Sequence, residues 1–317
     1  MAGIKAFSGR VSDRLETLFG GICCTPVEEL RMNNGMELEG ITVKWQDSPM
    51  TLGVNIKPYY EEYCKGRAFD EILSQIYGIL RNYGNIFLNA GIQSLEFSQI
   101  KDHIVCRLVN YEANKDLLQD VPYVRHYDLV ILFYLYLKQD GQSQATALIQ
   151  NPLWDSWRIS LEELLGQAVR NSERLVPCVF QSMGAILGGM FGEGADMAVH
   201  EEMLECLNKE KEPMLYVLTN TSRAYGAASA LYPNILQKIA DDLQSDLLMI
   251  PSSIHEWLIT KYTDDIDLNE MTGMVWAVNR MQVEVEDRLA DHVYIFRRGT
   301  GEWELPEDTG TCKESEG

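Results

Sequence analysis

Apolar side chains recur at helical spacing along the first hundred residues. In the stretch 11–19 they lie three or four positions apart, which places them on one face of a helix. Two further stretches with this period, PYYEEYCKG and RAFDEILSQIYGILRNYG, follow the break at Pro58. A short strand is predicted before that break, at 40–45. The pattern therefore predicts a mostly helical N-terminal lobe over residues 1–100.

The pattern changes to that of strands after residue 103. The runs HIVCRLVN and YDLVILFYLYL are rich in β-branched and aromatic residues, as buried strands are, and TALIQN predicts a third strand. The pair Ser160 and Glu163 then has the spacing of a capping box, so it predicts the start of a helix. Strands and helices are therefore mixed in this part of the chain.

A strand–helix–strand pattern marks the last third of the chain. The runs MLYVLT (214–219) and DLLMI (246–250) predict two buried strands, and between them lies a helix that Pro233 interrupts. We therefore predict an α+β fold: a helical N-terminal lobe, then a mixed β-sheet lobe at 101–305 that is flanked by helices and contains a βαβ-like unit at about 214–250. The acidic tail 306–317 is predicted to be disordered.

The net charge and the length of the longest apolar run limit which partners this protein can bind. The chain has 47 Asp and Glu against 27 Lys and Arg, a net charge of −20, so phosphate backbones and anionic lipid repel it. The longest apolar run, LVILFYLYL, is about half of the ~20 residues that cross a bilayer. The N-terminal sequence has no signal-peptide core, and the seven cysteines lack C-x-x-C spacing. We expect an acidic cytoplasmic protein that binds neither nucleic acid nor membrane.

Two polar turns follow the strands of the βαβ-like unit. If both strands lie in one sheet they run parallel, so the turns 219–226 and 251–256 fall at the same edge, where α/β sheets hold ligands. A helix that begins near Ala224 would point free N–H groups at this edge and favour an anion. The candidate ligand-binding residues are Thr219, Asn220, Arg223, Ser252, Ser253 and His255.

The turn 251–256 also has a structural interpretation and a catalytic one. In the structural interpretation, Ser253 and Glu256 form a capping box that begins a helix and leaves His255 at the surface. In the catalytic one, Ser252 or Ser253 is the nucleophile of a hydrolase, with His255 as its base and Glu256 nearby. No glycine flanks either serine, as a nucleophile elbow requires. The pattern therefore favours the structural interpretation.

Metal and cofactor motifs are absent from the sequence. His255-Glu256 begins an H-E-x-x-H pattern, but Ile259 occupies the position of the second histidine. The glycine-rich stretch 181–196 lacks both the P-loop and the dinucleotide-binding signature, so it predicts a flexible connection. We expect no metal and no cofactor.

Several long phrases of the sequence resemble one bacterial family. They include EGITVKWQDSPMTLGVNIKPYYEEYCKGRAFDEILSQI, WRISLEELLGQAVRNSERLVP, MLYVLTNTSRAYGAASALYPNILQKIADDL and LLMIPSSIHEWLI. The chain is similar, over about residues 10 to 298, to the family of gut Firmicutes known as domain of unknown function 5688. The resemblance implies a cytosolic bacterial protein whose turns 219–226 and 251–256 belong to shared phrases. It implies no catalytic roles, because the family has no assigned activity.

These observations favour a non-enzymatic binding or interaction protein. Its expected ligand or partner edge is formed by the turns 219–226 and 251–256, and a protein partner is favoured over a small anion because the net charge is so negative. The alternative is a hydrolase that uses Ser252 or Ser253 with His255.

Overall fold

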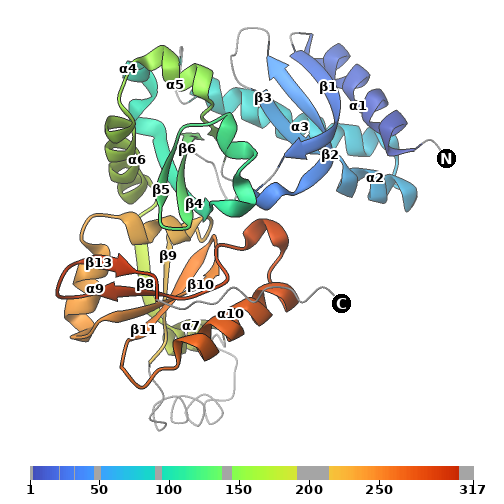
Figure 1. Cartoon of the computed structure of the whole chain (residues 1–317). Helices are drawn as coiled ribbons and strands as arrows, with labels where there is room; N and C mark the ends of the chain where they lie inside the picture. Colours follow the sequence, from blue (N-terminus) through green and yellow to red (C-terminus); the bar gives the residue numbers. More distant parts are fainter. Residues whose placement is uncertain are drawn as a thin grey trace. The chain divides into compact units, whose positions relative to one another are not determined.

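The structure, a computed structural model, describes residues 3–20, 22–31, 33–45, 51–89, 95–137, 145–190 and 214–306. Helices and antiparallel sheets both occur in this part of the chain, so the predicted α+β fold class is confirmed (Figure 1). Within it, no helix is both long enough and apolar enough to cross a membrane.

The chain divides into two compact units, which we describe separately. Unit 1 consists of residues 1–105, 112–123 and 132–168, and unit 2 consists of residues 106–111, 124–131 and 169–317. The division into domains at residue 100 stays a prediction. The tail 307–317 lies outside the described residues.

Unit 1 begins with three helices and a small sheet. They are α1 (Ile4–Phe19), β1 (Ile22–Arg31), β2 (Glu37–Trp45), β3 (Thr51–Asn55), α2 (Lys57–Cys64) and α3 (Phe69–Asn89). The strands form an antiparallel sheet in the order β1-β2-β3. The sequence predicted β2 alone, because β1 contains Pro26 and two acidic residues that weaken its strand pattern.

The core of this part of unit 1 joins the predicted helical faces to the sheet. Val11 and Leu15 of α1 are fully buried, as are Ile41 and Val43 of β2. They belong to one apolar cluster that also contains buried side chains of α3, among them Ile76. Burial of these side chains stabilises the sheet, although the residues of β1 have a weak intrinsic preference for a strand.

The middle of the chain alternates strands with short helices. Its elements are α4 (Phe97–Ile100), β4 (Ile104–Asn110), β5 (Tyr123–His126), β6 (Leu129–Leu137), β7 (Ala145–Leu148), α5 (Asn151–Trp157) and α6 (Leu161–Leu175). The strands form a sheet in the order β4-β6-β5, with β7 on β6. Ser160 Oγ accepts a hydrogen bond from the Glu163 amide at 3.1 Å, which confirms the predicted N-cap of α6.

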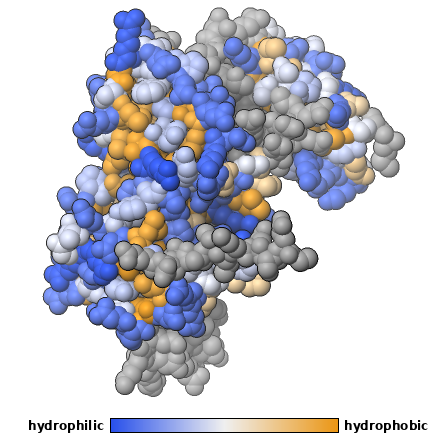
Figure 2. Space-filling model, viewed as in Figure 1, coloured by the Kyte–Doolittle hydropathy of each residue, from blue (hydrophilic) through white to orange (hydrophobic). Residues whose placement is uncertain are grey.

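Unit 2 contains a six-stranded antiparallel sheet in the order β13-β12-β10-β11-β9-β8. Its elements are β8 (Cys178–Ser182), α7 (Met183–Met190), β9 (Tyr216–Asn220), a 3₁₀ helix (Gly226–Leu231), α9 (Ile235–Leu243), β10 (Leu247–Ser253), β11 (Glu256–Lys261), α10 (Leu268–Met281), β12 (Tyr294–Arg297) and β13 (Glu302–Glu304). Figure 2 shows hydrophilic residues over much of the described surface on the face drawn, with hydrophobic areas between them.

The predicted βαβ-like unit is present in a modified form. β9 and β10 point the same way in one sheet, but β11 lies between them and is antiparallel to both. The helical crossover is α9, and it is preceded by the 3₁₀ helix instead of by one long α-helix, because Pro233 cannot continue a helix from the residues before it. In the glycine-rich stretch 181–196, predicted as a flexible connection, the first two residues end β8 and residues 183–190 form α7, while residues 191–196 lie outside the described part.

The turn between β5 and β6 packs within unit 2 on the β12–β13 hairpin. Asp128 Oδ1 accepts a hydrogen bond from the Tyr294 hydroxyl at 2.7 Å, and its Oδ2 lies 3.4 Å from His292 Nε2. Burial raises the pKa of Asp128, but the hydrogen bond and charge of His292, together with the Tyr294 hydroxyl, outweigh burial and hold this pKa below its usual value.

We expect Asp128→Asn to lower the free energy of unfolding by about 1–3 kcal/mol at neutral pH, since a hydrogen-bonded, half-buried carboxylate is lost. The folded-state pKa lies below the unfolded one (about 3.9), so this stability is fully present above that unfolded pKa and disappears as pH falls through the folded one. Urea unfolding of wild type and variant from pH 3 to 7 should show a constant difference above about pH 5 that shrinks below about pH 4.

Asp155→Asn is the matched control for this experiment, because Asp155 is exposed on α5. It should change the free energy of unfolding little at any pH in the series. A wild-type advantage over Asp128→Asn that stays constant down to pH 3 would contradict the role assigned to the Asp128 carboxylate.

Candidate functional site

The stretch 251–256 is a β-hairpin turn, not the start of a helix. Ser253 pairs with Glu256 across the β10–β11 ladder, and Ile254 and His255 form the two-residue turn. Ser253 Oγ accepts from the His255 amide at 3.1 Å, two residues on, and not from the Glu256 amide that a capping box would use. The capping-box prediction is therefore wrong: the flanking apolar runs pair with neighbouring strands, and tertiary pairing overrides a local capping pattern.

The two polar turns meet, as the sequence led us to expect. Thr219 Oγ1 donates to the His255 carbonyl at 2.8 Å, and the Tyr225 amide donates to His255 Nδ1 at 2.9 Å. The Ala227 amide donates to the Ile254 carbonyl at 3.2 Å. Backbone and side-chain bonds thus hold the turn after β9 against the tip of the β10–β11 hairpin.

Gly226 allows this close approach. A Cβ atom there would lie within 3.0 Å of Thr219 Oγ1, of the His255 carbonyl oxygen and of the Asn220 amide nitrogen. A distance that short is a steric clash, so only glycine fits between the two turns.

Both nitrogens of the His255 ring have partners. Nδ1 accepts the Tyr225 N–H, so it carries no proton, and Nε2 therefore carries the proton and lies 3.2 Å from Asp287 Oδ1. Ser252 Oγ instead donates to Glu256 Oε1 at 3.2 Å. Since neither ring nitrogen bonds a serine oxygen, this geometry does not favour the hydrolase alternative.

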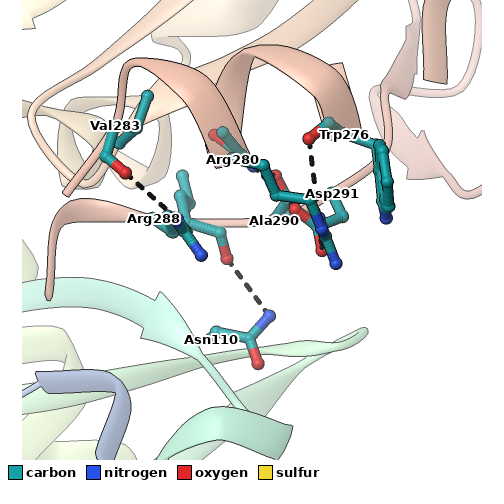
Figure 3. A network of polar contacts seen from close by, with 9 residues as sticks. Asn110, Trp276, Arg280, Val283, Arg288, Ala290 and Asp291 are labelled. Carbon is teal, nitrogen blue, oxygen red and sulfur yellow. Dashed lines mark hydrogen bonds and ion pairs between the residues drawn. The ribbon is translucent and has the colours of Figure 1, made fainter. Parts of the chain in front are cut away.

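The segment that carries Asp287 is itself tightly held. The Ile254 amide donates to the Asp287 carbonyl at 2.8 Å. Beyond it, Arg288 Nε donates to the Val283 carbonyl at 3.1 Å, and Asn110 Nδ2 to the Leu289 carbonyl at 3.2 Å; Figure 3 draws this network beneath α10. Asp287 is therefore fixed in place for its contact with His255.

The turn after β9 is stiffened by Asn220. Its Oδ1 accepts from the Ser222 amide at 3.0 Å and from the Ser222 hydroxyl at 2.7 Å, and its Nδ2 donates to the Ala224 carbonyl at 3.0 Å. Asn220 and Thr219 are buried, so their polar atoms serve the turn. Direct ligand contact by these two residues stays a prediction that the described contacts do not favour.

Two residues of this turn adopt the left-handed backbone region. Arg223 and Tyr225 both have φ 54°, a conformation that costs about 1–2 kcal/mol for a residue other than glycine. The Arg223 side chain is exposed, and it has no partner among the described residues. The fold thus holds a strained turn that presents one arginine to solvent, and such strain is concentrated at functional sites in proteins.

The expected anion site at a helix N-terminus is not formed near Ala224. The residues that follow make a six-residue 3₁₀ helix, and three amides at its start have acceptors: Tyr225 bonds His255, Ala227 bonds Ile254, and Ala228 bonds the Tyr225 carbonyl at 3.4 Å. This part of the prediction is wrong, because the amides that were expected to be free complete the contact between the turns.

Three residues of the site were missed by sequence reasoning: Tyr225, Asp287 and Arg107. The Arg107 guanidinium lies 3.3 Å from the centre of the Tyr225 ring, and Arg107 is only 8% exposed. No sequence signal joins these positions, since Arg107 and Tyr225 come from distant parts of the chain. For Tyr225, its place directly before Gly226 was a usable signal of a special turn.

Both His255→Ala and Ser253→Ala should destabilise the protein. His255→Ala leaves the Tyr225 amide and the Asp287 carboxylate without their ring partner, so we expect a loss of about 1–3 kcal/mol in the free energy of unfolding. Ser253→Ala removes one acceptor in a half-exposed turn and should cost about 0.5–1.5 kcal/mol. Urea unfolding measures both. Unchanged stability in His255→Ala would contradict a structural role for its ring.

The site therefore belongs to an α+β protein in which a strained, arginine-bearing turn is locked onto a β-hairpin. The chain belongs to DUF5688, a family of unknown function, whose model matches residues 4–298. No curated protein and no solved structure matches the chain. The family assignment agrees with the resemblance inferred from the sequence phrases, which ran over nearly the same residues.

Proposed function

We propose that this protein is a non-enzymatic binding protein whose partner edge is formed by the turns 219–226 and 251–256. The observation that carries the proposal is the exposed Arg223 on a strained turn that hydrogen bonds hold in one conformation. Arginine is enriched among the residues that dominate binding energy at protein interfaces. A rigid turn also reduces the entropy lost when its side chain becomes ordered.

A protein partner with an acidic group suits this edge better than a small anion. The backbone amides of Tyr225, Ala227 and Ala228 are already bonded within the site, and the chain as a whole carries a charge of −20. A carboxylate on a protein surface can pair bidentately with Arg223, while surrounding contacts contribute the rest of the affinity.

Affinity capture from a bacterial extract, quantified by mass spectrometry, tests this proposal. Wild-type protein should retain at least one specific protein, and Arg223→Ala should lower its recovery about tenfold or more, as loss of an interface hot spot does. Arg158→Ala is the matched control, because Arg158 is also exposed and has φ 55° but lies in unit 1. The proposal fails if every captured protein survives Arg223→Ala at the level of the control.

A fluorophosphonate probe tests the hydrolase alternative in the same preparation. Such probes react with serines that a neighbouring base has activated. Because the His255 nitrogens bond Tyr225 and Asp287, we expect no adduct on Ser252 or Ser253 by peptide mass spectrometry. An adduct on either serine that His255→Ala abolishes would replace the binding proposal with the hydrolase.

A further inference from the structure

A second feature of unit 2, distinct from the turns 219–226 and 251–256, is a cavity of about 530 Å³. Its walls come from the β5–β6 turn, from residues 230–237, which end the 3₁₀ helix and begin α9, and from the β12–β13 hairpin. This volume suits a small molecule, because ligand pockets in proteins are of about 300–1,000 Å³.

Aromatic rings line much of this cavity. His126 and Trp303 meet edge to face with their centres 4.6 Å apart, and Tyr127 donates a hydrogen bond from its hydroxyl to the Trp303 carbonyl. Tyr127 is nevertheless 40% exposed, so a residue whose hydroxyl is held in place still offers open surface. Aromatic faces of this kind attract cations through the ring quadrupole.

The charges near the cavity come from β12 and β13. Arg297 lies opposite Glu302, and its guanidinium bonds Glu304 and Asp246. The described residues that line the cavity include one acid, Glu302, and no lysine or arginine.

Burial lowers the pKa of His126, an effect that Asp128 opposes in part, so its ring stays neutral. Burial raises the pKa of Tyr127, and the charges of Glu302 and Glu304 raise it further.

We propose that this cavity binds a small organic cation, an ammonium group carried on an apolar body. The body lies against the exposed Tyr127 ring, and the ammonium group faces the Glu302 carboxylate. This inference is independent of the partner edge proposed above, because it rests on different residues.

The start of α9 also borders the cavity and acts in the opposite direction. The amides of Leu236 and Gln237 have no acceptor among the described residues, and a helix N-terminus carries the equivalent of about half a positive charge. The Glu302 carboxylate is a full negative charge, and the Arg297 guanidinium opposite it is already paired with two other carboxylates, so the sum still favours a cation. A preference for an anion would mean that the helix terminus dominates instead.

Three probes with one phenyl-containing body separate these possibilities: 2-phenylethylamine, 2-phenylethanol and phenylacetate, which are a cation, a neutral molecule and an anion at neutral pH. By calorimetry at low salt we expect the amine to bind about five- to tenfold more tightly than the alcohol, from ion pairing and cation–π attraction together. Phenylacetate should bind more weakly than the alcohol.

Glu302→Gln should abolish the preference for the amine over the alcohol, whereas Glu284→Gln should preserve it. Both glutamates are exposed in unit 2, but Glu284 does not line the cavity. The proposal is overturned if the amine and the alcohol bind equally to wild type, if phenylacetate binds best, if none of the three binds, or if Glu302→Gln keeps the preference. Thermal unfolding of both variants verifies that each is folded.

Discussion

Gly226→Ala should destabilise unit 2 by about 3 kcal/mol, the upper part of the usual range for overpacking a filled site. The new methyl group would clash with Thr219 Oγ1, the His255 carbonyl oxygen and the Asn220 amide nitrogen. Two of these three are backbone atoms of neighbouring strands and turns, so they cannot swing away as the end of a side chain can. The turn after β9 must therefore separate from the hairpin tip.

Hydrogen–deuterium exchange shows which part of unit 2 loses stability in Gly226→Ala. Amides of Tyr225 and Ala227, which bridge the two turns, should exchange much faster in Gly226→Ala than in wild type. The matched control is Gly273→Ala in the middle of α10, where an added Cβ meets nothing within 4 Å. That change should stabilise by about 0.5–1 kcal/mol through helix propensity. The same sign of effect at both glycines would contradict this account.

Trp257→Ala should cost about 3–5 kcal/mol, the usual loss for removing a buried tryptophan. Trp257 follows Glu256 on β11 and is fully buried, its Nε1 donates to the Ala227 carbonyl at 2.8 Å, and its ring meets those of Tyr294 and Trp303 edge to face. The substitution therefore removes packing from the sheet and leaves a buried carbonyl without its donor.

Urea unfolding followed by circular dichroism measures this loss, with Trp276→Ala as the control. Trp276 lies on α10, is only partly buried and packs beneath the Arg280 guanidinium at 3.9 Å. Its removal should cost about 1 kcal/mol or less, the value of an exposed cation–π contact. Equal losses for the two tryptophans would show that Trp257 does not hold the site and sheet together.

The spacing of apolar residues predicted those helices and strands whose structure is determined mainly by their own sequence. The helical spacing in α3 and the capping pair at the start of α6 are local signals, and burial strengthens them. The meeting of the turns 219–226 and 251–256 was also predictable, because it follows from a crossover between two strands of one sheet. The sequence therefore predicted that these two turns lie side by side; that they form a binding site stays a prediction.

The details of that site depended on residues far apart in the chain. Ser253 and Glu256 have the spacing of a helix cap, yet pairing of β10 with β11 and β12 forces a hairpin there. Likewise, the roles of the His255 nitrogens were set by Tyr225 and Asp287, which no local pattern connects to it. Such long-range partners decide whether a histidine serves catalysis or architecture.

The chain crosses between its two compact units several times, and this limits how its gene can be recombined. The chain passes from one unit to the other after residues 105, 111, 123, 131 and 168. No single cut in the polypeptide, and no single break in the gene, can therefore yield either unit whole and alone. Shuffling of gene segments must transfer both units as one block or leave each with missing strands.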